Sequence, residues 1–234
     1  MIQRLVILFF SLSVTCMSQA QRNWFTVYSD SGALVQDATA IIEDVVNQLH
    51  KVDADLELGT NQVIKHTTPY LIYMDLEKHQ INLPLWAEVI PEQKVFFADV
   101  TGDSSAAIKV FGLFFNGFYL VHEYGHAFAS CMGKKYDNHY DSEYDANLFA
   151  MAYWKHVQRD KDLESCYRWA RKMMENLKNP VPGNADPKKY LTDHYEELSA
   201  DPYKYGYIQF SQFIDIYNRQ DGFNWTELIR SYKK

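Results

Sequence analysis

The sequence has few cysteines, no long basic run and no internal repeat, and each absence narrows its possible functions. Cys16, Cys131 and Cys166 are the 3 cysteines of 234 residues, and no two form a C-x-x-C pair, so a cysteine-based zinc site is not expected. The formal charge is −7, which argues against a nucleic-acid partner. A chain of this length without repeats suits a single domain with a sizeable core.

The first twenty residues have the features of a secretory leader. Arg4 gives the amino-terminal end a positive charge, residues 5–14 form a short apolar run, and Ser18 and Ala20 are the small residues that a signal peptidase reads. We therefore expect a signal peptide at residues 1–20, cleaved after Ala20. Export to a periplasmic or extracellular location follows from that expectation.

Two alternatives to a cleaved leader are open. An uncleaved membrane anchor is disfavoured because the apolar run is short for a span, and a lipoprotein through Cys16 is disfavoured because residues 13–15 make a poor lipobox. Leader removal takes away one basic residue and no acid, leaving residues 21–234 at a formal charge of −8 with no expected membrane insertion. In an oxidising compartment Cys131 and Cys166 either pair or remain separate buried thiols.

The order of apolar patterns predicts an α+β fold in one domain. A strand or extended segment is expected at residues 23–28, an amphipathic helix at 33–49, and strands at 70–74 and 79–83. Residues 94–97 are either a third strand or part of a helix. The remainder is expected to be mainly helical, with helices at residues 105–131, 143–158, 160–177, 191–200 and 207–217.

The helix expected at residues 105–131 carries the pattern H-E-x-x-H. Residues four apart lie on one face of a helix, so His122 and His126 can offer their imidazoles to one metal ion. Glu123 is then close enough to reach a water bound to that metal. Because Lys109 and the motif itself interrupt the apolar run, a buried helix is favoured over a membrane span.

Two histidines and a base leave the metal short of a ligand. A third histidine six residues after the second is absent, since Met132 stands there and Ala129 replaces the accompanying glycine. Glu143 follows the second histidine by 17 positions, at the start of the next expected helix, capped by the preceding serine. Ala146 is small enough for two helices to approach closely, and Asn147 can hydrogen-bond a ligand imidazole.

H-E-x-G-H followed by E-x-x-A-N-x-F-A resembles the gluzincin metallopeptidases, and within them the ImmA/IrrE-type minimal peptidases, over residues 118–153. The resemblance implies a zincin-like domain with a small β-sheet, an active-site helix and a glutamate helix. It also implies one zinc ion held by His122, His126 and Glu143, with Glu123 as the catalytic general base.

This chain departs from that family at two points. Many gluzincins have aspartate where this chain has Asn147, and ImmA/IrrE-type proteins are usually intracellular regulators, whereas this chain has a leader. We therefore carry over the chemistry and not the regulatory role.

These patterns together predict a secreted zinc metallopeptidase that acts on a peptide or protein substrate. Tyr205, Tyr207 and His194 are candidate donors to the oxyanion, but ordinary packed or surface tyrosines are the favoured interpretation. His79 is expected to be a sheet residue rather than a ligand. The alternative function is a catalytically inactive zinc-binding protein that acts as an interaction module. A helical protein with a chance H-E-x-x-H is a third alternative, and oligomeric state is left open.

Overall fold

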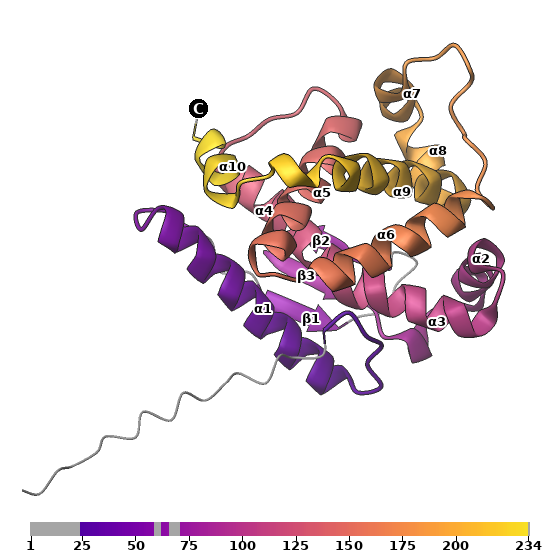
Figure 1. Cartoon of the computed structure of the whole chain (residues 1–234), viewed down its shortest axis with the longest axis horizontal. Helices are drawn as coiled ribbons and strands as arrows, with labels where there is room; N and C mark the ends of the chain where they lie inside the picture. The colour runs from indigo at the N-terminus through magenta and orange to yellow at the C-terminus, as the bar shows by residue number, and fades with distance from the viewer. Residues whose placement is uncertain (1–23, 59–61, 66–70, 234) are drawn as a thin grey trace, which may run out of the picture.

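The computed structural model describes residues 24–58, 62–65 and 71–233 as an α+β fold (Figure 1). The leader expected at residues 1–20 lies outside the described residues. The strands are β1 (Gln62–Lys65), β2 (Tyr73–Asp75) and β3 (Gln80–Leu83). The α-helices of the described part are α1 (Ser31–Val52), α2 (Pro91–Thr101), α3 (Ser104–Leu113), α4 (Tyr119–Cys131), α5 (His139–His156), α6 (Asp160–Met174), α7 (Pro187–Asp193), α8 (Tyr195–Ala200), α9 (Pro202–Asn218) and α10 (Trp225–Ser231).

The three described strands form a mixed sheet in the order β1-β3-β2. β1 runs parallel to β3, and β2 runs antiparallel to β3 with Met74 opposite Ile81. Helix α1 packs along β1, and α4 packs against β2 and β3. β2 is therefore an edge strand that lies beside the helix with the H-E-x-x-H pattern.

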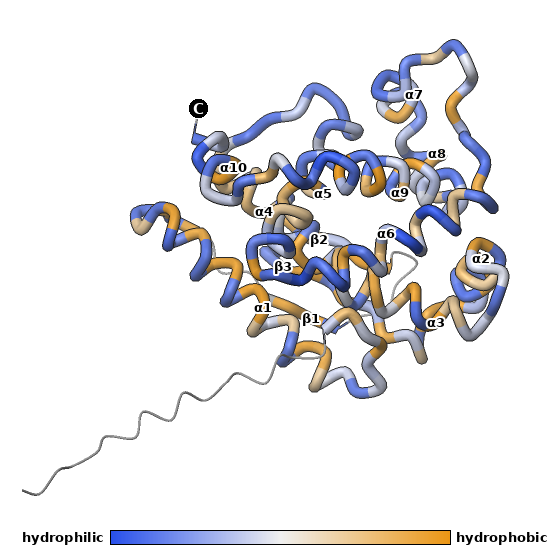
Figure 2. The backbone as a smooth tube through the Cα atoms, in the orientation of Figure 1, coloured by the Kyte–Doolittle hydropathy of each residue, from blue (hydrophilic) through white to orange (hydrophobic). Residues whose placement is uncertain are grey.

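Helix α1 covers the sheet with one apolar stripe. Asp30 caps its amino-terminal end by accepting a hydrogen bond from the Ala33 amide at 2.7 Å. In Figure 2 the turns of α1 alternate between hydrophobic and hydrophilic colour, as expected for a helix with one buried face. The buried stripe consists of Leu34, Ala38, Ile41, Ile42, Val45 and Leu49.

The expected helix at residues 105–131 is divided by a π-helical turn at Phe114–Phe118. Asn116 lies inside that turn with φ −107° and ψ 16°, and its buried amide donates to the Pro84 carbonyl at 2.9 Å. Single π-helical turns inside longer helices are a recognised place for a bend and often lie near functional sites. The turn separates α3 from α4, so the histidines are carried by a helix that begins at Tyr119.

The described part of the amino-terminal segment, from Trp24 to Tyr28, forms neither a strand nor a continuous extended run, because it bends at Phe25 and Thr26, and Phe25 has a φ of 66°. A Cβ on Gly112 would lie 2.7 Å from the Thr26 backbone, and the Trp24 indole donates to the Gly117 carbonyl at 3.1 Å. The two glycines therefore permit close packing of this segment.

The stretch Ser104–Cys131 is long and apolar enough to cross a membrane, but 67% of its most apolar window is buried inside the protein. It therefore serves as the central helix of the core, around which the other elements pack.

Several element boundaries differ from the sequence prediction. Strand β1 and helix α10 were not predicted, and residues 94–97 lie in helix α2. Helix α5 begins four residues before Glu143, because Asn138 caps it by accepting from the Asp141 amide at 2.8 Å, so Ser142 is not the cap. The helix predicted at 191–200 is divided between α7 and α8, and α9 begins at Pro202, where proline needs no amide partner.

Candidate metal centre

Helix α4 brings two imidazoles to one point. His122 and His126 lie one turn apart on this helix, and their Nε2 atoms are 3.2 Å from each other. His122 is buried with 3% of its surface exposed, whereas the side chain of His126 is 20% exposed. One imidazole is thus enclosed by protein, and the other is open on one side.

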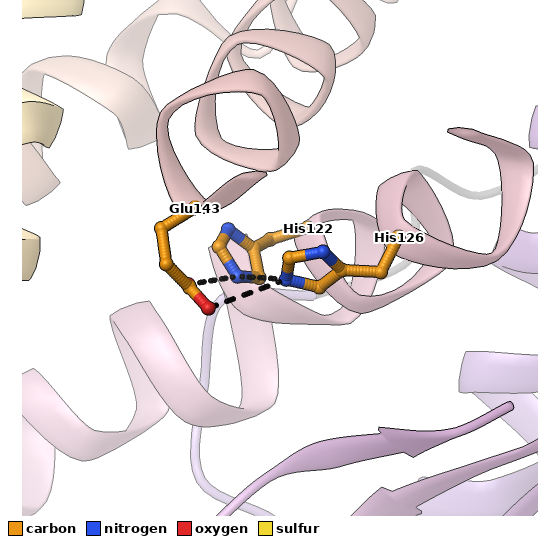
Figure 3. Close-up of side chains that lie close together, drawn as sticks. All are labelled: His122, His126 and Glu143. Atoms are coloured by element: carbon orange, nitrogen blue, oxygen red, sulfur yellow. Dashed lines mark hydrogen bonds and ion pairs between the residues drawn. The ribbon is translucent and has the colours of Figure 1, made fainter. Parts of the chain in front are cut away.

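Helix α5 supplies a carboxylate to the same point. The Glu143 oxygens lie 3.3 Å from His122 Nε2 and 3.8 Å from His126 Nε2. Figure 3 shows the carboxylate and the two imidazoles directed toward one another from adjacent helices. The three candidate ligand atoms lie within 4.8 Å of one another, so the group predicted from the sequence can hold a metal ion.

Small residues bring α4 and α5 close enough for this arrangement. A Cβ on Gly125 would lie 3.3 Å from the Cα of Ala146, and Ala146 is buried at the contact. The approach predicted from the small side chain of Ala146 is therefore present. It places Glu143, in the second turn of α5, opposite the histidine face of α4.

The charges of the three groups favour a cation at their centre. Burial alone would raise the pKa of Glu143, but the two imidazoles hold that pKa well below its ordinary value. Burial alone would lower the pKa of His126, but the Glu143 carboxylate and its hydrogen bond raise it to about 9. The raised pKa of His126 and the lowered pKa of Glu143 both reflect the attraction between these two groups.

A buried network of amide side chains hydrogen-bonds to His122 and Glu143. Asn147 Oδ1 lies 3.0 Å from His122 Nδ1, in the role predicted for it. The Asn147 amide donates to the side-chain oxygens of Gln209 and Gln212, each at 3.1 Å. Gln209 in turn donates to Glu143 at 2.7 Å. Both glutamines come from α9, and the sequence reasoning missed them.

The other imidazole has weaker support. His126 Nδ1 lies 3.5 Å from the Ser142 hydroxyl, which is at the limit of a hydrogen bond. Ser142 therefore contacts the candidate centre from within α5 instead of capping that helix.

Glu123 lies beside the candidate ligands. It is 7% exposed, and burial raises the pKa of its carboxyl. The backbone amide of Met74, in edge strand β2, hydrogen-bonds to this carboxylate and opposes the increase. Glu123 thus interacts with both histidines and with edge strand β2, and its raised pKa suits a proton acceptor at neutral pH.

Of the three candidate oxyanion donors, only Tyr205 is close to the centre. Burial raises the pKa of its phenol well above the ordinary value, the charges of Glu143 and Glu123 raise it further, and Gln209 hydrogen-bonds to it. Tyr207 is partly buried and packs against both the main core and the small apolar cluster of Leu191, Leu198 and Ile208. His194 is exposed, 4.0 Å from a carboxylate oxygen of Glu197.

The remaining candidates lie away from the ligands. His79 lies in the β2–β3 turn, one residue before β3, so it is not the strand residue that the sequence predicted, and it is not among the three candidate ligands. Cys131 and Cys166 do not pair: the Cys131 thiol donates to the Glu57 carbonyl at 3.0 Å, and the buried Cys166 thiol lies 3.6 Å from the Leu113 carbonyl.

No protein-family model, no curated protein and no solved structure matches this chain. The class to which the protein is assigned therefore follows from its own fold and geometry: an α+β protein with a buried two-histidine, one-carboxylate group that can bind a metal ion.

Proposed function

We propose that this chain is an exported zinc-dependent metallopeptidase of the gluzincin type. The observation that carries the proposal is the convergence of His122, His126 and Glu143 within 4.8 Å, with the buried carboxyl of Glu123 beside them. Three protein ligands leave coordination positions for substrate, as expected of a catalytic site.

The donor set fits zinc. Two imidazole nitrogens and one carboxylate oxygen are ligands that catalytic zinc takes in other hydrolases. Two histidines and a carboxylate also occur on non-haem iron in oxygenases. The adjacent Glu123 favours hydrolysis, because an acid–base carboxyl at that place has a role in proton transfer from water.

A zinc ion bound there would supply Lewis-acid chemistry, polarising a peptide carbonyl and lowering the pKa of a coordinated water. Glu123 accepts the proton of the attacking water and later delivers it to the leaving amine. The raised pKa of Glu123, caused by burial, suits both transfers. Asn147 keeps the His122 ring in one orientation through its contact at 3.0 Å.

Tyr205 is the proposed donor to the oxyanion. Its phenol has a strongly raised pKa and therefore keeps its proton near Glu143 and Glu123. A neutral donor aimed at developing negative charge stabilises the transition state by about 2.7–4 kcal/mol. Tyr205→Phe should lower kcat by about 100-fold to 1000-fold without changing zinc content. Tyr207→Phe is the matched control, and equal losses in both variants would contradict the assignment.

The substrate is proposed to lie along the edge of β2 that does not pair with β3. β2 pairs on one side with β3, and its Met74 amide faces Glu123. An extended peptide added at this edge would gain main-chain hydrogen bonds and pass over the proposed general base.

The proposal is tested by measuring zinc and peptide cleavage on the same samples. The purified protein should contain about one zinc per chain and cleave members of a broad peptide library. Glu123→Gln should retain the zinc and lose cleavage, because an amide accepts no proton in this role. Full cleavage by that variant would refute the mechanism, and zinc without cleavage in the unmodified protein would favour an inactive interaction module.

Export is tested separately by mass spectrometry of the mature amino terminus. A chain that begins at Gln21 would support it, and one that still begins at Met1 would refute it.

A further inference from the structure

A cavity of about 260 Å³ lies between the second half of α4 and the β2–β3 turn. Its apolar walls come from three segments: Leu58 precedes the sheet, Leu76 follows β2, and the α4 wall is formed by Tyr124, Ala127 and Phe128. Outside those walls, His79, Ser130 and Cys131 line the rim.

Two of the residues that line this cavity are close in the chain to Glu123 or to its partner Met74. Ala127 follows Glu123 by four helical residues, which is about 6 Å along α4. Leu76 follows Met74, whose amide meets Glu123, by two residues and is the first residue after β2. An extended peptide on the edge of β2 would cover the same distance in about two residues.

The chemistry of the cavity suits an apolar group. Tyr124 and Phe128 are each 1% exposed and form a fixed floor, while the Leu76 side chain at the mouth is 46% exposed. No Asp, Glu, Lys or Arg is among the lining residues of the cavity. A cavity of about 150 Å³ is large enough to hold a benzene molecule, so this one has room for a leucine or phenylalanine side chain.

We propose that this cavity is a specificity pocket that binds a large apolar side chain of the substrate, about two residues from the cleaved bond. The proposal rests on the peptidase function, because the distance from the pocket to the cleaved bond is measured from Glu123. It adds a substrate class, peptides with leucine, methionine or phenylalanine at one fixed distance from the cleavage site.

The first test is a cleavage profile across a peptide library, read by mass spectrometry. The unmodified protein should select a large apolar residue at one position about two residues from the cut. Leu76→Asp should lower kcat/KM for those peptides by about 10-fold to 100-fold. Ile108→Asp, which changes another exposed apolar side chain on α3 that is 41% exposed, should keep the preference. A profile without such a position, or one unchanged in Leu76→Asp, would overturn the proposal.

A second test needs no turnover. Cys131 is exposed at the rim, whereas Cys166 is buried and burial raises the pKa of its thiol well above the ordinary value. N-ethylmaleimide should therefore label Cys131 selectively over Cys166, and peptide mapping can follow each site. In the Glu123→Gln variant, octapeptide pools rich in leucine and phenylalanine should slow labelling of Cys131 at least about 5-fold at saturation. Pools with serine in their place should not.

The two tests separate failure of the pocket from failure of the proposed function. Cleavage with no apolar preference and no protection of Cys131 would leave a peptidase without this pocket. Protection of Cys131 by apolar peptides in a protein that cleaves none would keep the pocket as a peptide-binding site and refute the peptidase.

Discussion

The two sides of the candidate metal centre are supported differently. On one side, His122 is buried, Asn147 holds its second nitrogen, and two glutamines of α9 hold Asn147. On the other side, His126 is partly exposed, and its second nitrogen has only the Ser142 hydroxyl at 3.5 Å. The enclosed side can fix ligand geometry, whereas the open side leaves room for substrate. The contrast leads to four predictions, ordered by expected effect.

The largest effect should come from Glu143, the ligand between the two sides. Glu143→Ala removes the carboxylate and leaves two imidazoles, so zinc affinity should fall by more than the roughly 100-fold that loss of a supporting partner can cost. Competition with a chelator of known affinity measures this change. Glu123→Gln is the control, because it alters a neighbouring carboxyl that is not a proposed ligand. Equal zinc loss in the two variants would contradict the assigned ligand set.

The next effect should come from Asn147, the centre of the enclosed side. Asn147→Ala frees the His122 ring and should weaken zinc binding by about 10-fold to 100-fold. It also leaves the oxygens of Gln209 and Gln212 without their donor, so the free energy of unfolding should fall by about 1–3 kcal/mol. Denaturant titration of the metal-free protein measures the second change. If neither the zinc affinity nor the free energy of unfolding changed, the enclosed side would not stabilise the ligands.

Gln209 should have a smaller effect, since it contacts Glu143 from one direction only. Its amide donates to Glu143 at 2.7 Å, so Gln209→Ala should weaken zinc binding by about 10-fold, at the lower end of the range for supporting residues. Gln212→Ala is the matched control, because Gln212 donates to the Tyr140 carbonyl instead of a ligand. A greater loss in the Gln212 variant would reverse the assigned roles.

The smallest effect should come from Ser142 on the open side. Because its contact with His126 is long, Ser142→Ala should change zinc affinity by less than about 3-fold. The same chelator competition measures it, beside Asn147→Ala. A loss as large as that of Asn147→Ala would remove the contrast between the two sides.

The sequence indicated the ligands because they follow local rules. His122 and His126 are one helical turn apart, and Glu143 begins a nearby pattern that resembles a known family. Asn147 is on the same helix as Glu143, one turn on, so its support of an imidazole was also predictable. The two histidines are related to each other by the period of α4, and Glu143 is related to Asn147 by the period of α5.

The glutamines of α9 were not predictable in that way. Gln209 and Gln212 follow Asn147 by 62 and 65 positions, and only tertiary packing brings them together. A signal was present, because the two glutamines are three apart and lie among buried apolar residues of α9. A buried polar pair of that kind requires partners, and a ligand shell can provide them.

Fold prediction failed where an element was short or where several residues could serve as a cap. Strand β1 has four residues and little periodicity, so its pairing with β3 depends on a distant neighbour. The polar residues before Glu143 include both Asn138 and Ser142, and local sequence did not distinguish which would cap α5. The α+β class and the main helices were correct because their apolar patterns are long.

The most direct test of the central claim is X-ray absorption spectroscopy at the zinc edge of the zinc-loaded protein. If His122, His126 and Glu143 hold the metal, the spectrum should fit two imidazole nitrogens at about 2.0–2.1 Å and carboxylate oxygen at about 2.0–2.2 Å. The oxygen and nitrogen shell should change in Glu143→Ala. A sulfur ligand at about 2.3 Å, or a spectrum unaltered by Glu143→Ala, would contradict the account.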